Sequence, residues 1–182
     1  NHKFVIIRLV SWKASHDIGH KGFSLDYLKR LIELVEEHSR VFISVEGDIP
    51  EQLERFKLPI DPAEIHSILY YAELFIGEGA TMASECAVLG TPSVYVNSLS
   101  AGSLENQAKE NLIHMFNSTD GVIEKVEEIL KNDNYKTQQK IMRDRSLEKK
   151  VDVNKFMEWF ILNYPNSYEK IKENSSLQYE IK

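Results

Sequence analysis

The chain has 182 residues, of which 42% are hydrophobic, and its net charge is −6. It is long enough for one domain with a proper core, and the absence of a strong basic block disfavours nucleic-acid binding. The single Cys86 excludes an internal disulfide. No apolar run approaches membrane-spanning length and the start lacks a signal-peptide pattern, so we expect a cytoplasmic protein.

Residues 4–10 predict the first strand, and their nearly continuous apolar character favours a central position in a parallel sheet. Arg8 lies near the carboxyl end of this strand, where ligands bind in open α/β sheets. It either pairs with a neighbouring carboxylate or faces the ligand cleft. Because the strand begins almost at once, we expect the chain to be a fragment that lacks an N-terminal partner domain.

Residues 11–22 form a polar loop that is long for a strand-to-helix connection, and long loops are often functional. The loop contains His16, Asp17, His20 and Lys21. His16 and Asp17 could act as acid and base, and His16 or Lys21 could contact a phosphate or a substrate. The spacing of the two histidines and Asp17 matches no specific zinc motif, so we expect no metal site. Solvated loop side chains are the remaining alternative.

The next segment continues the alternation of helices and strands. Ser24 is expected to cap a helix that carries apolar residues at helical spacing to about His38. His66 falls on a later helix, where a structural or exposed role is favoured over a catalytic one. We expect a strand at 41–45, a short helix at 50–56, a short edge-like strand at 58–60, and a helix that starts at Asp61-Pro62.

Residues 74–97 carry the clearest local pattern in the chain. They predict a strand at 74–76, a turn over Gly77-Glu78-Gly79 whose glycines permit positive φ, a helix at 81–89 closed by Gly90, and a strand at 93–96. Thr81 is the expected N-cap of the helix. A strand, a glycine turn and a helix N-terminus form a potential anion site, because outward-facing N–H groups and about half a positive charge of helix dipole meet there.

Glu85 stands out within this predicted helix. It lies four positions after Thr81, so the two side chains share a helix face. With Thr81 as the N-cap, the capping-box position would be Ser84, so capping does not explain Glu85. A carboxylate one turn below a phosphate cradle is well placed to accept hydrogen bonds from a ribose diol. The alternative is a surface glutamate that gains about 0.3–1 kcal/mol from the dipole.

The last third of the chain is mainly helical. Its strongly charged segment is expected to lie on the surface, and its aromatic segment either packs in a core or docks on an absent domain. We expect helices at 103–111, from Thr119 as the cap, at 134–151 and at 154–164, a strand at 112–116, and a loosely ordered tail at 166–182. We therefore divide the chain into a domain at 1–150 and a C-terminal helix and tail at 151–182.

Strands that alternate with helices imply a doubly wound α/β domain with a parallel, Rossmann-like sheet. No G-x-G-x-x-G follows the first strand, which argues against a dinucleotide site, and no G-x-x-x-x-G-K-[ST] motif occurs, which excludes a P-loop NTPase. The glycine turn lies instead in the fourth major strand–helix unit.

The segment from Gly77 to Glu85, with Ala87, Leu89, Gly90 and Pro92 after it, resembles that of UDP-N-acetylglucosamine 2-epimerases and related glycosyltransferases. The order of elements resembles the C-terminal, nucleotide-sugar-binding half of GT-B-fold proteins. The resemblance implies that the turn holds a diphosphate and that Glu85 binds the ribose. The arrangement of Arg8, Ser11-Trp12, His16-Asp17, Gly19 and Gly22 is more similar still to an uncharacterised, glycosyltransferase-like family of prokaryotic proteins. The similarity covers residues 4–97 well and the rest only by element order.

Two departures from the epimerase pattern affect what the resemblance implies. Ala80 and Thr81 replace paired glycines, so the turn is less permissive. The His-Arg-x-Asn loop of the epimerases is absent, which puts epimerase chemistry in doubt. GT-B enzymes place acceptor binding, and often the catalytic base, on the N-terminal domain, so the fragment alone is expected to bind without turnover.

The sequence thus predicts the donor-binding domain of a GT-B-type glycosyltransferase or sugar-nucleotide-modifying enzyme, with a UDP-sugar as donor and polysaccharide biosynthesis as the setting that the resemblance implies. No cofactor and no metal are expected. One rival is a non-catalytic GT-B-like scaffold that binds a nucleotide or a protein. Another is a metal-dependent hydrolase that uses His16, Asp17 and His20. The expected nucleotide-binding residues are Arg8, Lys21, Glu46, Gly79, Ala80, Thr81, Ser84 and Glu85, and the expected catalytic residues are His16 and Asp17.

Overall fold

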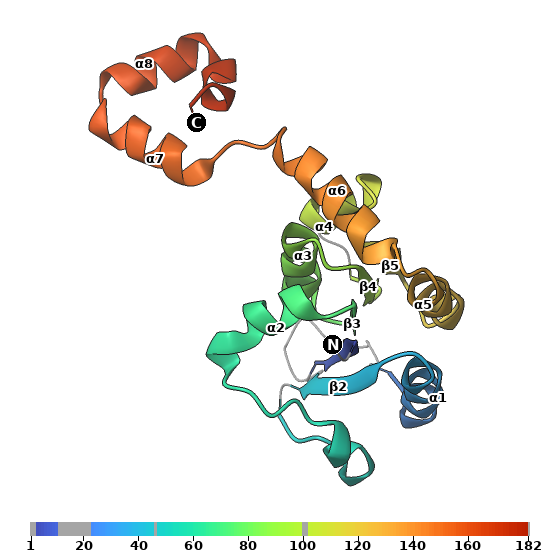
Figure 1. Ribbon diagram of the computed structural model, residues 1–182. Coiled ribbons are helices and arrows are strands. Elements are labelled where there is room, and N and C mark those ends of the chain that lie inside the picture. Colours follow the sequence, from blue (N-terminus) through green and yellow to red (C-terminus); the bar gives the residue numbers. More distant parts are fainter. Residues whose placement is uncertain (1–2, 11–22, 46, 100–101, 182) are drawn as a thin grey trace. The chain divides into compact units, whose positions relative to one another are not determined.

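The computed structural model describes residues 3–10, 23–45, 47–99 and 102–181 (Figure 1). The chain forms two compact units, Asn1–Arg143 and Asp144–Lys182. The division falls inside a helix, α6 (Tyr135–Leu147). The first unit contains every strand among the described residues.

A five-stranded parallel sheet is the centre of the first unit. Its strands run in the order β2-β1-β3-β4-β5, so the order reverses between β1 and β3. The expected doubly wound α/β fold, with the first strand in the interior of the sheet, is therefore confirmed. The strands are β1 (Phe4–Leu9), β2 (Arg40–Val45), β3 (Leu74–Gly77), β4 (Ser93–Val96) and β5 (His114–Phe116).

Helices cover both faces of this sheet (Figure 1). One face packs against α1 and α5, and the other against α2, α3 and α4. Two 3-10 helices follow β2, at Glu51–Phe56 and Pro62–Glu64. The helices of the two faces are α1 (Leu25–Glu36), α5 (Val122–Lys131), α2 (Ile65–Tyr71), α3 (Ala80–Leu89) and α4 (Gly102–Lys109).

The apolar run of β1 exists because both of its faces are buried. Val5 and Ile7 belong to the core beneath α1 and α5, whereas Ile6 belongs to the core beneath α2, α3 and α4, and each is fully buried. Successive side chains of a strand point to opposite faces, so a strand buried on both faces needs apolar residues without interruption. The hydroxyl of Ser24 accepts a hydrogen bond from the N–H of Tyr27, which confirms the expected cap of α1.

The charged helix α6 is anchored more firmly than a surface helix. Gln139 is 1% exposed, and its Nε2 donates to the carbonyl of Leu112 at 2.9 Å. Arg143 Nη1 donates to the carbonyl of Val88 at 3.1 Å. The helix therefore satisfies carbonyl groups at the ends of neighbouring elements, which its charged composition alone did not indicate.

Two predicted details are wrong. The edge-like strand at 58–60 is absent: Lys57 forms only an isolated bridge with Ile43, and Pro59 has no N–H with which to continue a ladder. Thr119 does not cap α5, because the N-cap is Gly121 at φ 78°. The carbonyl of Thr119 instead accepts a hydrogen bond from the Tyr27 hydroxyl at 3.2 Å.

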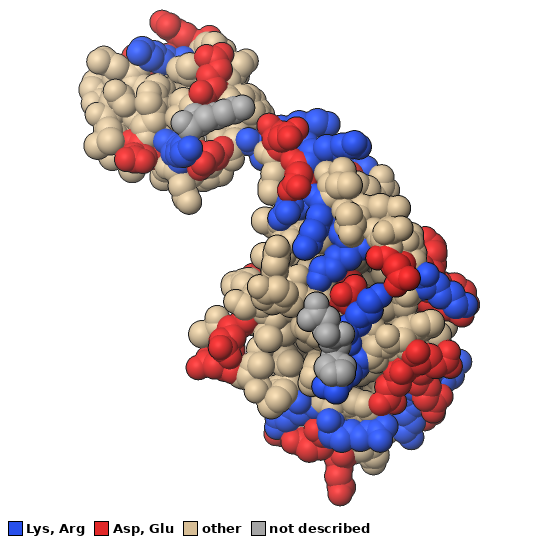
Figure 2. All heavy atoms as spheres, viewed as in Figure 1, with Lys and Arg blue, Asp and Glu red and all other residues tan. Residues whose placement is uncertain are grey.

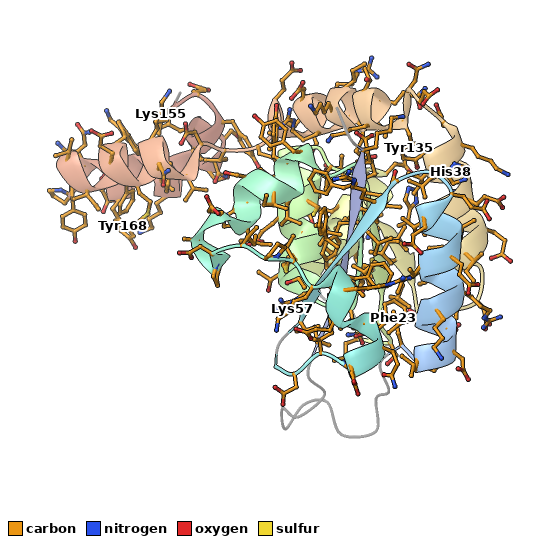
Figure 3. All side chains as sticks on the ribbon, turned by 60° about the horizontal axis from the view of Figure 1, so that its bottom comes forward. Phe23, His38, Lys57, Tyr135, Lys155 and Tyr168 are labelled. Carbon is orange, nitrogen blue, oxygen red and sulfur yellow. The ribbon has the colours of Figure 1, made fainter. Side chains whose placement is uncertain are left out.

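The second unit consists of short helices. They are α7 (Val153–Leu162), α8 (Asn166–Glu173) and a 3-10 helix at Ser175–Tyr179. Asp152 caps α7, and the rings of Phe156, Trp159 and Phe160 lie beside one another. The expectation of a loosely ordered tail is wrong for residues 166–179, because α8 and the 3-10 helix occupy most of them and the Ser167 hydroxyl donates to the carbonyl of Phe160. Figure 3 labels Lys155 on α7 and Tyr168 on α8.

Gly77 lies where β3 packs tightly beside β1. A Cβ at this position would lie 2.9 Å from the Cβ of Arg8 and 2.7 Å from Cζ of the Phe75 ring. Its φ is not positive, so it is the lack of space, and not a left-handed conformation, that favours glycine here.

We predict that Gly77→Ala lowers the free energy of unfolding by about 1–3 kcal/mol, because the methyl group must displace packed atoms. Gly102→Ala is the matched control, since a Cβ at Gly102 meets nothing within 4 Å. Denaturant unfolding of the two variants checks this. Equal stability of the Gly77 and Gly102 variants would contradict the close packing of β1 on β3.

Candidate functional site

The candidate site lies at the carboxyl ends of β1 and β3. In open α/β sheets, ligands bind outside these ends, at the point where the strand order reverses. Arg8 and Gly77 are paired in register at this point, and α3 begins three residues after Gly77. The glycine turn and the first strand thus meet where the fold favours a ligand.

The first turn of α3 presents backbone N–H groups to this edge. The N-cap is Gly79, with φ −88° and ψ 116° and no side-chain cap, so Thr81 is the second helical residue rather than the N-cap. Neither Gly77 nor Gly79 has a positive φ, which corrects the expectation for the turn. The first helical hydrogen bond among the described residues runs from Ala83 N to Gly79 O, and the N–H groups before it have no intrahelical acceptor.

Arg8 lines a small pocket beside this turn. Its Nη1 donates to the hydroxyl of Ser44, at 2.6 Å, on the neighbouring strand β2. The pocket has a volume of about 300 Å³, and Lys57 and Met82 line it together with apolar residues of β2 and of the segment before α2. Arg8 thus contributes to the wall of a hollow at the expected edge of the sheet.

A larger pocket lies on the outward face of α3. Its volume is about 600 Å³, within the range of small-molecule sites. It brings together four of the residues that the sequence singled out, Ala80, Thr81, Ser84 and Glu85. The remaining lining residues come from α2, from the C-terminal half of α3 and from α4, and are His66, Val88, Leu89, Ser103 and Leu104.

Glu85 contacts His66 inside this pocket. Its Oε1 lies 3.3 Å from Nε2 of His66, and the side chains are 33% and 61% exposed. Sequence reasoning treated His66 as structural or exposed and missed this contact. The contact depends on how α2 packs beside α3, which no local spacing reveals.

Glu78 is the most buried acidic residue of this edge, at 4% exposed. Its carboxylate accepts hydrogen bonds from the N–H groups of Phe23, at 2.6 Å, and Val10, at 3.3 Å. Its carbonyl accepts from Asn97 Nδ2 at 3.0 Å. Phe23, labelled in Figure 3, lies two residues before α1. Sequence reasoning read Glu78 only as part of the turn, although a glutamate between two glycines at a strand end was a signal.

Several predicted site residues lie outside the described residues. These are His16, Asp17, Lys21 and Glu46, together with His20 of the hydrolase alternative. Their roles stay predictions. Within 3–10, 23–45, 47–99 and 102–181, no group of three or more His, Cys, Asp or Glu side chains could hold a metal ion. No helix in those ranges is long and apolar enough to cross a membrane.

A family model described as "Protein of unknown function (DUF354)" matches residues 5–164. The chain belongs to this family. No functionally curated protein matches it in sequence.

Solved structures similar to this DUF354 chain are GT-B glycosyltransferases and an epimerase, which confirms the expected resemblance in fold. The wall teichoic acid polymerase TagF, as its H548A variant, has a TM-score of 0.53 and 12% identity over 80% of this chain and 38% of its own. A protein described as a UDP-N-acetylglucosamine 2-epimerase from Listeria monocytogenes has a TM-score of 0.54 and 13% identity over 81% and 44%. The chain thus spans less than half the length of either.

We predict that Glu78→Gln lowers the free energy of unfolding by about 1–3 kcal/mol, because the new NH₂ group must face one of the two N–H donors. Denaturant unfolding measures the effect, with Glu33→Gln as the control on the exposed face of α1. If Glu78→Gln and Glu33→Gln leave the free energy of unfolding equally unchanged, the Glu78 carboxylate does not stabilise the segments that contain Val10 and Phe23.

Proposed function

We propose that this chain is the donor-binding domain of a GT-B-type glycosyltransferase or sugar-nucleotide-modifying enzyme, and that it binds a nucleotide-sugar. The observation that carries the proposal is the shared pocket of Ala80, Thr81, Ser84 and Glu85 along the outward face of α3. Such a pocket offers N–H donors for a diphosphate at one end and a carboxylate for hydroxyl groups one turn further along the helix.

In this proposal the sugar nucleotide lies across the carboxyl ends of the strands. The N–H groups of Gly79, Ala80 and Thr81 hold the diphosphate, and Glu85 accepts hydrogen bonds from the ribose. Arg8, with His16 or Lys21, offsets the phosphate charge as the leaving group departs, which is electrostatic stabilisation without a metal.

Fewer observations bear on the identity of the base and on the binding of the acceptor. Glu46 and Gly47, after β2, are the proposed wall for the base. Uracil is favoured by the epimerase resemblance, whereas another similar structure, of TagF H444N, was determined with CDPG, at a TM-score of 0.52 and 10% identity over 79% of this chain and 37% of its own. Acceptor binding is assigned to a partner domain, and His16 and Asp17 are the proposed catalytic residues of this chain.

The two rival functions predict different experimental results. A non-catalytic scaffold would show no stabilisation by a nucleoside diphosphate if its ligand is a protein. A hydrolase built on His16, Asp17 and His20 would require metal and would lose activity to a chelator. The proposed transferase site would bind its nucleotide equally well with or without chelator.

We predict that UDP near millimolar concentration raises the melting temperature of the whole protein. A ligand at 100 times its Kd adds about 2.7 kcal/mol to the free energy of unfolding. Thermal shifts with UDP, CDP, GDP and ADP identify the preferred base. The absence of a shift with all four would sink the proposed function.

We also predict that Glu85→Gln weakens UDP binding at least tenfold, about 1.4 kcal/mol, because an amide is a weaker acceptor than a carboxylate for a diol. The free energy of unfolding of the free protein should change little, since Glu85 is one-third exposed. Calorimetric titration and denaturant unfolding measure the two effects.

Glu33→Gln, on the opposite face of the sheet, is the control for a lost acidic charge. Unchanged affinity in Glu85→Gln would show that Glu85 is a surface glutamate. A loss of stability without ligand would show that it is a structural carboxylate instead.

A further inference from the structure

We infer that His66 is a positioning residue that holds Glu85 for a ligand's vicinal diol, an inference that rests on the proposed function. The two side chains come from different helices, α2 and α3, and line the same pocket of about 600 Å³. His66 Nε2 lies 3.3 Å from Glu85 Oε1. Sequence spacing does not predict this contact, because nineteen positions separate the two residues.

The contact involves only one of the two carboxylate oxygens of Glu85. His66 Nε2 approaches only one oxygen of Glu85, Oε1. Among the described residues, Glu85 has no other side-chain partner. The second oxygen therefore remains as an acceptor for hydroxyl groups in the pocket, and an ionised carboxylate has lone pairs enough for two such donors.

Two hydrogen bonds, one buried and one partly buried, hold the helices that carry this pair. The Thr91 hydroxyl donates to the carbonyl of Leu69 at 2.8 Å, which ties α2 to the segment after α3. Gln107 Nε2 donates to the carbonyl of Ser84 at 3.4 Å, which ties α4 to α3 on the other side of the pocket. The distance between His66 and Glu85 is thus set by the packing of α2 on α3 rather than by two mobile side chains alone.

An exposed ion pair by itself contributes little to stability. His66 is 61% exposed, so a structural role predicts almost no effect of its removal. A positioning role predicts an effect on ligand affinity instead, because a carboxylate held in one rotamer loses less conformational entropy when it binds. The two roles therefore differ in what a His66 variant changes.

The test measures UDP and 2′-deoxyuridine diphosphate binding by calorimetry in the whole protein. The wild type should bind UDP about tenfold more tightly than the deoxy analogue, because the analogue lacks one of the two hydroxyl groups that would donate to the Glu85 carboxylate. His66→Ala should weaken UDP binding about fivefold and reduce this preference, with unfolding by denaturant unchanged. His66→Gln, which restores an N–H donor, should recover most of the affinity.

His38→Ala is the matched control, because Figure 3 places His38 beyond the end of α1, away from Phe23, and His38 lines a different pocket. The double variant His66→Ala/Glu85→Gln should bind UDP no more weakly than Glu85→Gln alone, since His66 acts through Glu85. Additive losses, or an unchanged affinity in His66→Ala while the wild type binds UDP, would overturn the inference and leave the proposed function standing. A wild type that binds no nucleoside diphosphate would overturn both.

Discussion

The close contact between β1 and β3 brings Arg8 and the start of α3 to one edge of the sheet. Gly77 allows the two strands to approach, and the register pairs it with Arg8. The same contact places Gly79 beside Val10, so the start of α3 lies against the end of β1. Because the strand order reverses here, this edge is the natural ligand crevice of a doubly wound sheet. The pocket next to Arg8 lies at this edge, whereas the pocket of Glu85 lies between α2, α3 and α4.

A buried carboxylate, that of Glu78, lies at this edge of the sheet. Glu78 places a buried carboxylate beside the expected anion site, which would oppose a phosphate group. Two backbone N–H groups donate to it, and such donors stabilise a buried carboxylate. The protein as a whole is acidic, and the face shown in Figure 2 intersperses acidic with basic side chains. Attraction of an anion would therefore depend on N–H groups and on individual cations such as Arg8, not on a broad positive field.

The fold was predictable from the sequence because its signals are local. Doubly buried strands such as β1 need continuous apolar residues, and Ser24 caps a helix with its own side chain. The contacts that position the residues of the candidate site join segments that are far apart in the sequence. The bonds from Glu78 reach 55 and 68 positions along the chain, and the pairing of His66 with Glu85 depends on helix packing. Thr119 was misread as a cap because Gly121 adopts a left-handed conformation that no pattern required.

The most direct test of the central claim is amide NMR of the whole protein during a UDP titration. This chain has eight glycines, whose amide signals lie in a separate region of the spectrum, so Gly79 can be followed. We expect the amides of Gly79, Ala80 and Thr81 to shift saturably, while Gly90 at the far end of α3 stays in place. Saturable binding that leaves the first turn of α3 unshifted would contradict a diphosphate site at the junction of β1, β3 and α3.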